Sequence, residues 1–260
     1  MTTLVERRPV AFTLGFGVAM IAVTVIVRLI LGAVVPSLTL DGIGLVLNWI
    51  FVGLVVSLVA WLGWWERIRL TAPVNRRAIP YLLPFAAMVF LPTAFGFAIP
   101  EVSLVNGIDV PPWAALFVIV VGVSLGAALS EELLYRGVML RALEPRGRAK
   151  AVLLPAFVFG FSHISRVILG GSIVDWLPQM ILIALLGVGL GAVAFRLESL
   201  WPLVLWHFAV DVGGLLVANP SPLLELAVLA LIGAVFLMGI GLLWQDRGRA
   251  MEPPQSPARV

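Results

Sequence analysis

Several ionisable side chains lie within long apolar stretches of this sequence, where a charge is costly, and six of them are informative. On insertion scales an ionisable group inside a membrane-spanning helix costs about 2.5–3.5 kcal/mol. The six are Glu131, Glu132, Arg136, His163, His207 and Asp211, and they include both histidines of the chain. Carboxylates and histidines are side chains that transfer protons in hydrolytic reactions. We interpret the six as one functional site, because so costly a group has no obvious packing role.

The two adjacent carboxylates are expected to differ in role. Glu132 and Arg136 are four residues apart, so on a helix they share a face and can form an ion pair. Glu131 then points about 100° away and stays free. The spacing therefore predicts one structural carboxylate beside one chemical carboxylate.

The two histidines belong to later apolar runs, and His207 is followed four residues on by Asp211. We counted residues from the nearest charged residue of the adjoining polar segments, at about 1.5 Å per residue. Glu131, His163 and His207 then lie about 15, 20 and 13 Å from the inner edge of the membrane. Three separate helices are thus expected to bring polar groups together in the inner half of the bilayer.

Each feature has a simpler structural interpretation when it is taken alone. Glu132 with Arg136 forms a common type of structural ion pair, and His207 with Asp211 could be a hydrogen-bonded pair. A lone histidine in a span is often a satisfied packing residue. The argument for chemistry therefore rests on the joint pattern.

Composition indicates the elements that position these residues. Only 12% of the 260 residues are charged and 61% are hydrophobic, whereas a soluble domain carries about 25% charged residues. Apolar runs near the span of a bilayer recur along the chain, and they are too uniformly apolar for barrel strands. We expect an all-α, polytopic transmembrane helical bundle. About eight spans are predicted, at 9–35, 43–65, 78–99, 112–136, 151–169, 173–195, 201–218 and 222–244.

Charge placement predicts the orientation of the bundle. Of the 17 basic residues, 14 fall in segments 1–8, 66–77, 137–150, 196–200 and 245–260, which alternate with the other polar segments. By the positive-inside rule both termini are cytoplasmic, and we expect a multi-pass protein of the cell membrane. This clustering in short segments also argues against nucleic acid as the partner of a chain whose pI is about 10.2.

A few further residues set limits on the chemistry and the packing. The chain has no cysteine, which excludes disulfides, thiolate metal sites and a cysteine nucleophile. Arg28 and Arg166 lie within spans, and we expect them to pack or to extend towards the interface. The alternating glycines at 187, 189 and 191 predict close helix packing. The polar, proline-containing segment 245–260 is expected to be disordered.

The six residues resemble the three motifs of the CPBP family of intramembrane proteases, named after CAAX proteases and bacteriocin-processing enzymes and also called Abi. Glu-Glu-x-x-x-Arg is matched by Glu131, Glu132 and Arg136; Phe-x-x-x-His by Phe159 and His163; His-x-x-x-Asn/Asp by His207 and Asp211. The resemblance covers about 125–215. It implies an intramembrane endopeptidase that cuts a protein or peptide near the cytoplasmic side, with CAAX-type processing of prenylated proteins as one candidate activity.

The resemblance also implies roles for single residues. Glu131 would be the base that activates water, and His163 would orient that water and protonate the leaving amine. Arg136 would fix Glu132. His207 would donate to the oxyanion, with Asp211 setting its tautomer. The CAAX-processing members end their third motif in Asn, and an ionised Asp cannot donate a hydrogen bond as that amide does.

Two mechanisms stay open at this point. One is free of metal. The other uses zinc bound by Glu131, His163, His207 and Asp211, because two histidines with carboxylates form a plausible zinc set with an open position for water.

The chain is expected to divide into three parts: 1–111 with three transmembrane helices, a CPBP-like core at 112–218, and a last helix with a cytoplasmic tail at 219–260. Two other functions compete with the protease. The first is a catalytically silent membrane scaffold or regulator. The second is a small transporter in which Glu131, His163 and Asp211 relay protons, although the sequence has no inverted repeat of the kind such proteins use.

Overall fold

The computed structural model describes residues 4–108 and 110–251, with no side-chain description for Leu40 or 248–251. In this part of the chain the regular elements are helices, and β pairing is limited to two isolated bridges. The elements are α1 Leu4–Arg7, α2 Pro9–Val34, α3 Leu40–Leu62, η1 Arg76–Leu82, α4 Leu83–Phe90, η2 Leu91–Phe95, α5 Pro112–Phe117, η3 Val118–Leu125, α6 Gly126–Glu131, η4 Glu132–Met139, α7 Leu140–Leu143, η5 Glu144–Arg146, α8 Arg148–Ser162, α9 Ile164–Ile168, α10 Ile173–Leu197, α11 Trp201–Leu215 and α12 Pro222–Met251.

Seven helical stretches among the described residues are long and apolar enough to cross a membrane. They are Pro9–Val34, Asp41–Leu62, Arg76–Phe95, Pro112–Arg146, Arg148–Ile168, Ile173–Leu197 and Pro222–Arg247. The remaining predicted span, 201–218, corresponds to α11, whose 15 residues extend only about 22 Å. The prediction of a polytopic helical bundle is confirmed, with α11 as a shorter member of it.

The fourth span is longer than predicted. We expected a polar loop from residue 137, but α5, η3, α6, η4, α7 and η5 follow one another without a break from Pro112 to Arg146. Arg141 suggested a loop, yet it is buried: its guanidinium lies 5.2 Å from the Phe195 ring centroid and 3.3 Å from the Glu144 carboxylate. Glu131 therefore lies about 22 Å from the end of this helix, farther than the roughly 15 Å predicted from the position of Arg141.

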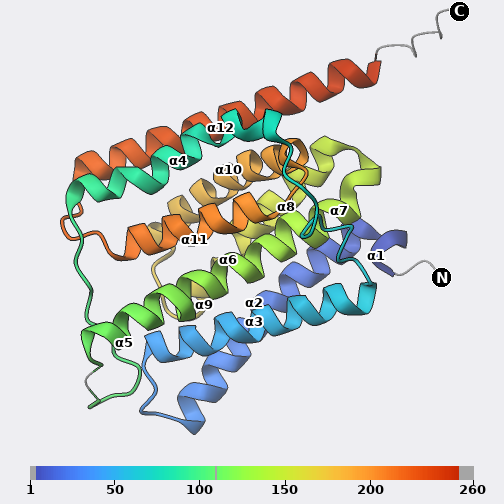
Figure 1. Ribbon diagram of the computed structural model, residues 1–260. Helices are drawn as coiled ribbons and strands as arrows, with labels where there is room; N and C mark the ends of the chain where they lie inside the picture. Colours follow the sequence, from blue (N-terminus) through green and yellow to red (C-terminus); the bar gives the residue numbers. More distant parts are fainter. Residues whose placement is uncertain (1–3, 109, 252–260) are drawn as a thin grey trace, which may run out of the picture.

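The helices are layered around α10, which packs against α8 on one side and α12 on the other, while α4 lies alongside α12 (Figure 1). A Cβ on Gly239 of α12 would lie 2.9 Å from Gly189 Cα on α10, so the two backbones are in direct contact. The predicted close packing of the glycine series is thus confirmed. One buried cluster joins residues from all three predicted parts of the chain and the other joins residues from the first two. The division into those parts stays a prediction.

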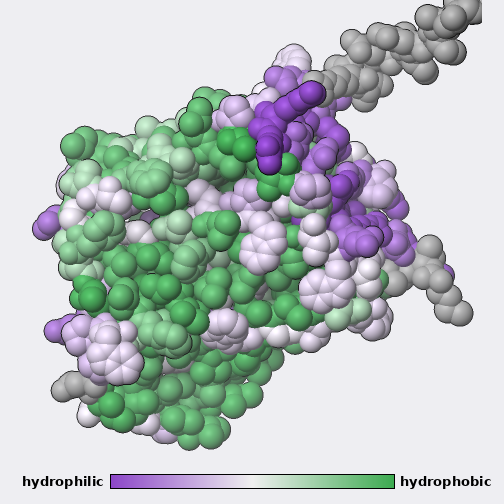
Figure 2. Space-filling model, in the orientation of Figure 1, coloured by the Kyte–Doolittle hydropathy of each residue, from purple (hydrophilic) through white to green (hydrophobic). Residues whose placement is uncertain are grey.

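Hydrophilic side chains gather at one end of the molecule, where α1 and the end of α12 both lie, while the visible flank is largely apolar (Figure 2). This agrees with the prediction that both termini share one side. The tail prediction is wrong for 245–251, because α12 continues to Met251. Asp246 pairs with Arg148 and Arg196 at 2.8 Å each, which fixes this part of α12 to α8 and α10. Residues 252–260 lie outside the described residues.

Candidate active site

Glu132 is the structural centre of the site. Its side chain is fully buried, and its Oε1 accepts hydrogen bonds from Arg136 Nη1 and from His207 Nδ1, both at 2.9 Å. Arg136 lies one helical turn away on η4, so the predicted ion pair is confirmed. The bond to His207 joins this helix to α11. A single carboxylate oxygen therefore holds the first and the third motif together.

Phe159 attaches the second motif to this centre. The Arg136 guanidinium lies 4.5 Å from the Phe159 ring centroid, within the range of a cation–π contact. The Phe159 ring also packs edge-on against the His163 imidazole, with centroids 5.7 Å apart. The aromatic residue of Phe-x-x-x-His thus supports both the buried arginine and the histidine one turn further on.

His163 occupies the junction between α8 and α9. Its Nδ1 lies 3.0 Å from the Phe159 carbonyl oxygen, which can only accept, so Nδ1 carries the proton. In the neutral ring Nε2 is then unprotonated and can accept a hydrogen bond. The backbone of the preceding turn therefore fixes the tautomer of His163.

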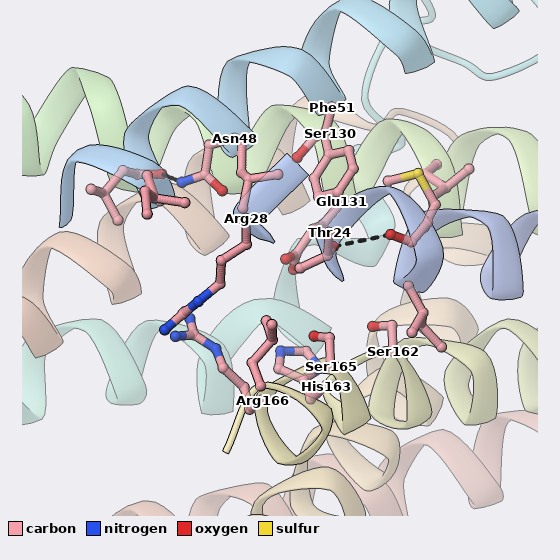
Figure 3. A pocket seen from close by; sticks show the side chains of 18 of the residues that line it. Thr24, Arg28, Asn48, Phe51, Ser130, Glu131, Ser162, His163, Ser165 and Arg166 are labelled. Atoms are coloured by element: carbon pink, nitrogen blue, oxygen red, sulfur yellow. Dashed lines mark hydrogen bonds between the residues drawn. The ribbon is translucent and has the colours of Figure 1, made fainter. Parts of the chain in front are cut away.

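Glu131 has an environment opposite to that of its neighbour. Its side chain is 31% exposed and lines a cavity of about 450 Å³ together with His163. Residues from α2, α3, the long helix of Glu131 and the α8–α9 junction form the walls of this cavity, and Figure 3 shows Glu131, Ser130 and His163 around it. The predicted contrast between a paired and a free carboxylate is therefore present in the structure.

His207 faces three carboxylates. Its Nδ1 binds Glu132, while its Nε2 lies 3.7 Å from Glu131 Oε2 and 3.6 Å from Asp211 Oδ2. We expected Asp211 to set the tautomer of His207, but Glu132 makes the bond to Nδ1 and Asp211 lies just beyond hydrogen-bond distance of the other nitrogen. The reason is the rotation of α11 against the long helix, which spacing along one helix cannot reveal.

The orientation of α11 has a separate anchor in Trp206, the residue before His207. Its indole Nε1 donates to the Phe85 carbonyl oxygen of α4 at 2.8 Å, and the two rings meet edge to face with centroids 5.0 Å apart. Trp206 is buried. This contact fixes the face of α11 that His207 presents to Glu132.

Sequence reasoning missed three residues of the cavity wall. Arg28 and Arg166, interpreted as packing or interfacial residues, both line the cavity, as does Asn48 of α3. Asn48 Nδ2 donates to the Val123 carbonyl oxygen at 3.2 Å. One signal was present: neither arginine has an acidic residue three or four positions away with which to pair along its helix.

The predicted zinc ligands do not assemble as a ligand set. Across residues 4–108 and 110–251, no three His, Cys, Asp or Glu side chains are grouped so that they could hold a metal ion. Of the four predicted ligands, His207 has carboxylate oxygens of Glu131 and Asp211 within 4 Å, whereas His163 is hydrogen-bonded to its own helix. Zinc dependence stays a prediction.

Comparison with known proteins adds one finding. Residues 112–213 match the model of the Rce1-like family, described as type II CAAX prenyl endopeptidase. The match supports the resemblance of these residues to the CPBP family. The matched segment begins at the long helix and contains all six predicted site residues. No curated protein and no solved structure shows a significant match to the chain.

Proposed function

We propose that this protein is an intramembrane endopeptidase that cleaves a prenylated protein near its C-terminus. The observation that carries the proposal is the contrast between two adjacent carboxylates: Glu132 is buried in a hydrogen-bonded ion pair, whereas Glu131 opens into the cavity that His163 also lines. A structural protein has no need of the second, open carboxylate. The match to a CAAX prenyl endopeptidase model supports this reaction and this class of substrate.

Glu131 is the general base in this mechanism. Its carboxylate takes a proton from a water molecule in the cavity, and the water oxygen attacks the carbonyl carbon of the peptide bond. The neutral His163, with its proton held on Nδ1 by Phe159, offers the Nε2 lone pair to the same water and orients it. When the tetrahedral intermediate collapses, the C–N bond breaks and the proton held by Glu131 passes to the leaving amine, so that the base is regenerated.

The developing oxyanion needs a donor, and we assign this role to His207 Nε2. With Nδ1–H bound to Glu132, a ring that carries both protons can donate its second proton to the oxyanion. The negative charges of Glu132 and Asp211 balance the positive charge of the imidazolium. Asp211 therefore has an electrostatic role, which suits a carboxylate better than the donor role of the Asn found in other CAAX-processing members.

Glu132 and Arg136 act as positioning residues. Neither faces the cavity: their side chains are 0% and 3% exposed, respectively. They hold His207 and, through Phe159, His163 at a fixed separation from Glu131. Preorganised groups of this kind contribute to catalysis because they need no reorganisation during the reaction.

The substrate reaches this site within the membrane. The helices that line the cavity are long enough to span a bilayer, and we therefore place the entry of a prenyl-anchored peptide in the membrane phase. The basic end that carries both described chain ends is assigned to the cytoplasm, and the membrane to the cell membrane. A cut near the cytoplasmic side follows from this orientation.

The test compares protein termini in host membranes that contain the wild-type protein or the Glu131→Gln variant at equal abundance. New termini present only with the wild type are the expected result, and their sequences identify the substrate. Glu225→Gln is the matched control, because Glu225 is exposed in the first turn of α12, outside the site. Loss of a general base lowers the rate by about 10²–10⁴-fold. Identical termini with folded wild-type and Glu131→Gln proteins would favour the silent scaffold.

A further inference from the structure

Two arginines lie on the wall of the cavity that contains Glu131, and the mechanism uses neither. Arg28 belongs to α2 and Arg166 to α9. Their side chains come from opposite walls and bring their guanidinium groups side by side (Figure 3). The two positive charges are close enough to repel each other.

No carboxylate that the structure describes neutralises this pair. Among the described residues, no acidic side chain lies within 4 Å of either guanidinium, although Asp41 lines the same cavity. Arg166 contacts the Trp176 ring, with 5.4 Å between the guanidinium carbon and the ring centroid. Charges within a membrane are expensive unless they are paired. Two converging, unpaired guanidinium groups are therefore suited to an anion that enters the cavity.

We propose that Arg28 and Arg166 form a clamp for the free C-terminal carboxylate of the peptide substrate. Guanidinium groups bind carboxylates through paired, charge-assisted hydrogen bonds. A peptide is favoured over a lipid headgroup as the source of the anion, because both arginines line the same cavity as Glu131 and His163. The clamp rests on the proposed function, and it specifies in addition which end of the substrate the protein recognises.

The spacing of Arg166 from His163 agrees with this assignment. A C-a-a-X sequence has three residues after its prenylated cysteine, and three extended residues span about 10 Å. Arg166 follows His163 by three residues, or roughly 5 Å along a helix, and its long side chain adds to that reach. Both arginines lie near the ends of their helices that are remote from the chain termini. The substrate would thus enter tail first, with its C-terminus pointing away from the basic end.

A binding experiment tests the clamp without requiring turnover. The full-length Glu131→Gln protein is placed in phosphatidylcholine nanodiscs, which carry no net anionic lipid. The probe is a fluorescent, farnesylated peptide ending in Cys-Val-Ile-Met, prepared as the free acid and as the C-terminal amide, and its anisotropy is compared with that in empty nanodiscs. We expect the acid to bind about ten- to a hundredfold more tightly than the amide, the range for hydrogen bonds to charged groups.

Adding Arg28→Gln or Arg166→Gln should reduce this preference about tenfold or more, while Lys at either position should retain part of it. Arg67→Gln is the matched control, since Arg67 pairs with Glu6 at the opposite end of the molecule. Size exclusion and thermal melting confirm that each variant is folded. Equal binding of acid and amide by the parent protein would refute the clamp.

Cleavage of the same peptides by the protein with Glu131 intact separates the two proposals. If acid and amide are cut equally well, the protease stands and the clamp fails. If the acid is preferred in binding but neither peptide is cut, the clamp stands and the proposed activity on this substrate class fails. If the Gln variants lose affinity for added phosphatidylglycerol but keep the acid-to-amide ratio, the arginines form a lipid site and the clamp is wrong.

Discussion

The buried ion pair at the centre of the site allows a quantitative test of the packing argument. Glu132 and Arg136 are almost completely shielded from solvent, and their 2.9 Å contact is the arginine's only ion pair among the described residues. Removing one member of a buried pair leaves an uncompensated charge and costs about 3–5 kcal/mol. We therefore expect Glu132→Gln and Arg136→Met each to lower the free energy of unfolding by this amount.

The double variant distinguishes this explanation from a simple loss of contacts. When Glu132→Gln and Arg136→Met are combined in one protein, no unpaired charge remains, and the amide oxygen of the introduced glutamine can still accept from His207 Nδ1. The double variant should then be no less stable than either single variant, which corresponds to a coupling energy of about 3 kcal/mol. The expectation follows from charge compensation and not from side-chain size.

Reversible unfolding in mixed micelles, followed by intrinsic tryptophan fluorescence and by steric trapping, measures these free energies. Glu131→Gln is the internal control, because that carboxylate is partly exposed in the cavity and should change the stability by less than about 1 kcal/mol. Additive losses in the double variant would show that the two charges do not depend on each other. Our account of the site as a buried, compensated network would then be refuted.

Three further predictions concern the packing, the basic end and the metal. Gly239→Ala should lower the free energy of unfolding by about 1–3 kcal/mol, because its Cβ would enter the α10 backbone. Gly241→Ala is the control and should be neutral, since its Cβ meets no atom within 4 Å. Equal effects of the two substitutions would contradict the close contact between α12 and α10. Asp246→Asn should lower the free energy of unfolding by about 1 kcal/mol, because it releases Arg148 and Arg196. This loss of stability should become smaller as salt is added. A loss that does not depend on salt would indicate a packing effect. Finally, treatment with a metal chelator should leave peptide cleavage unchanged. The metal-free mechanism would be contradicted if the protein held stoichiometric zinc, lost its activity when the zinc was removed, and regained it when the zinc was returned.

Much of the site could be predicted because its key relationships are local. The pairing of Glu132 with Arg136 and the open position of Glu131 follow from helical spacing alone. The apolar runs likewise predicted the helices, since in a bilayer every backbone polar group must be satisfied within the segment. These features depend on neighbours within one turn, which the sequence displays directly.

Contacts between helices were less accessible. The bond from His207 to Glu132 depends on the rotation of α11, which the Trp206 anchor fixes, and the sequence does not reveal that anchor. Arg141 was misplaced in a loop because its burial depends on Phe195, more than fifty residues away. Arg28 was interpreted as a packing or interfacial residue because nothing along α2 indicates the cavity opposite it.

The shortness of α11 has a consequence for the surrounding lipid. Its 15 residues extend about 22 Å, while the hydrocarbon core of a bilayer is about 30 Å thick. A helix shorter than the hydrocarbon layer is accommodated by local thinning of the bilayer, and side chains of α11 such as Trp201 and Leu205 are exposed on the surface of the bundle. Local thinning beside α11 would bring the headgroup region and its water closer to His207. Thinning at this place would supply water to the reaction that we propose for this site.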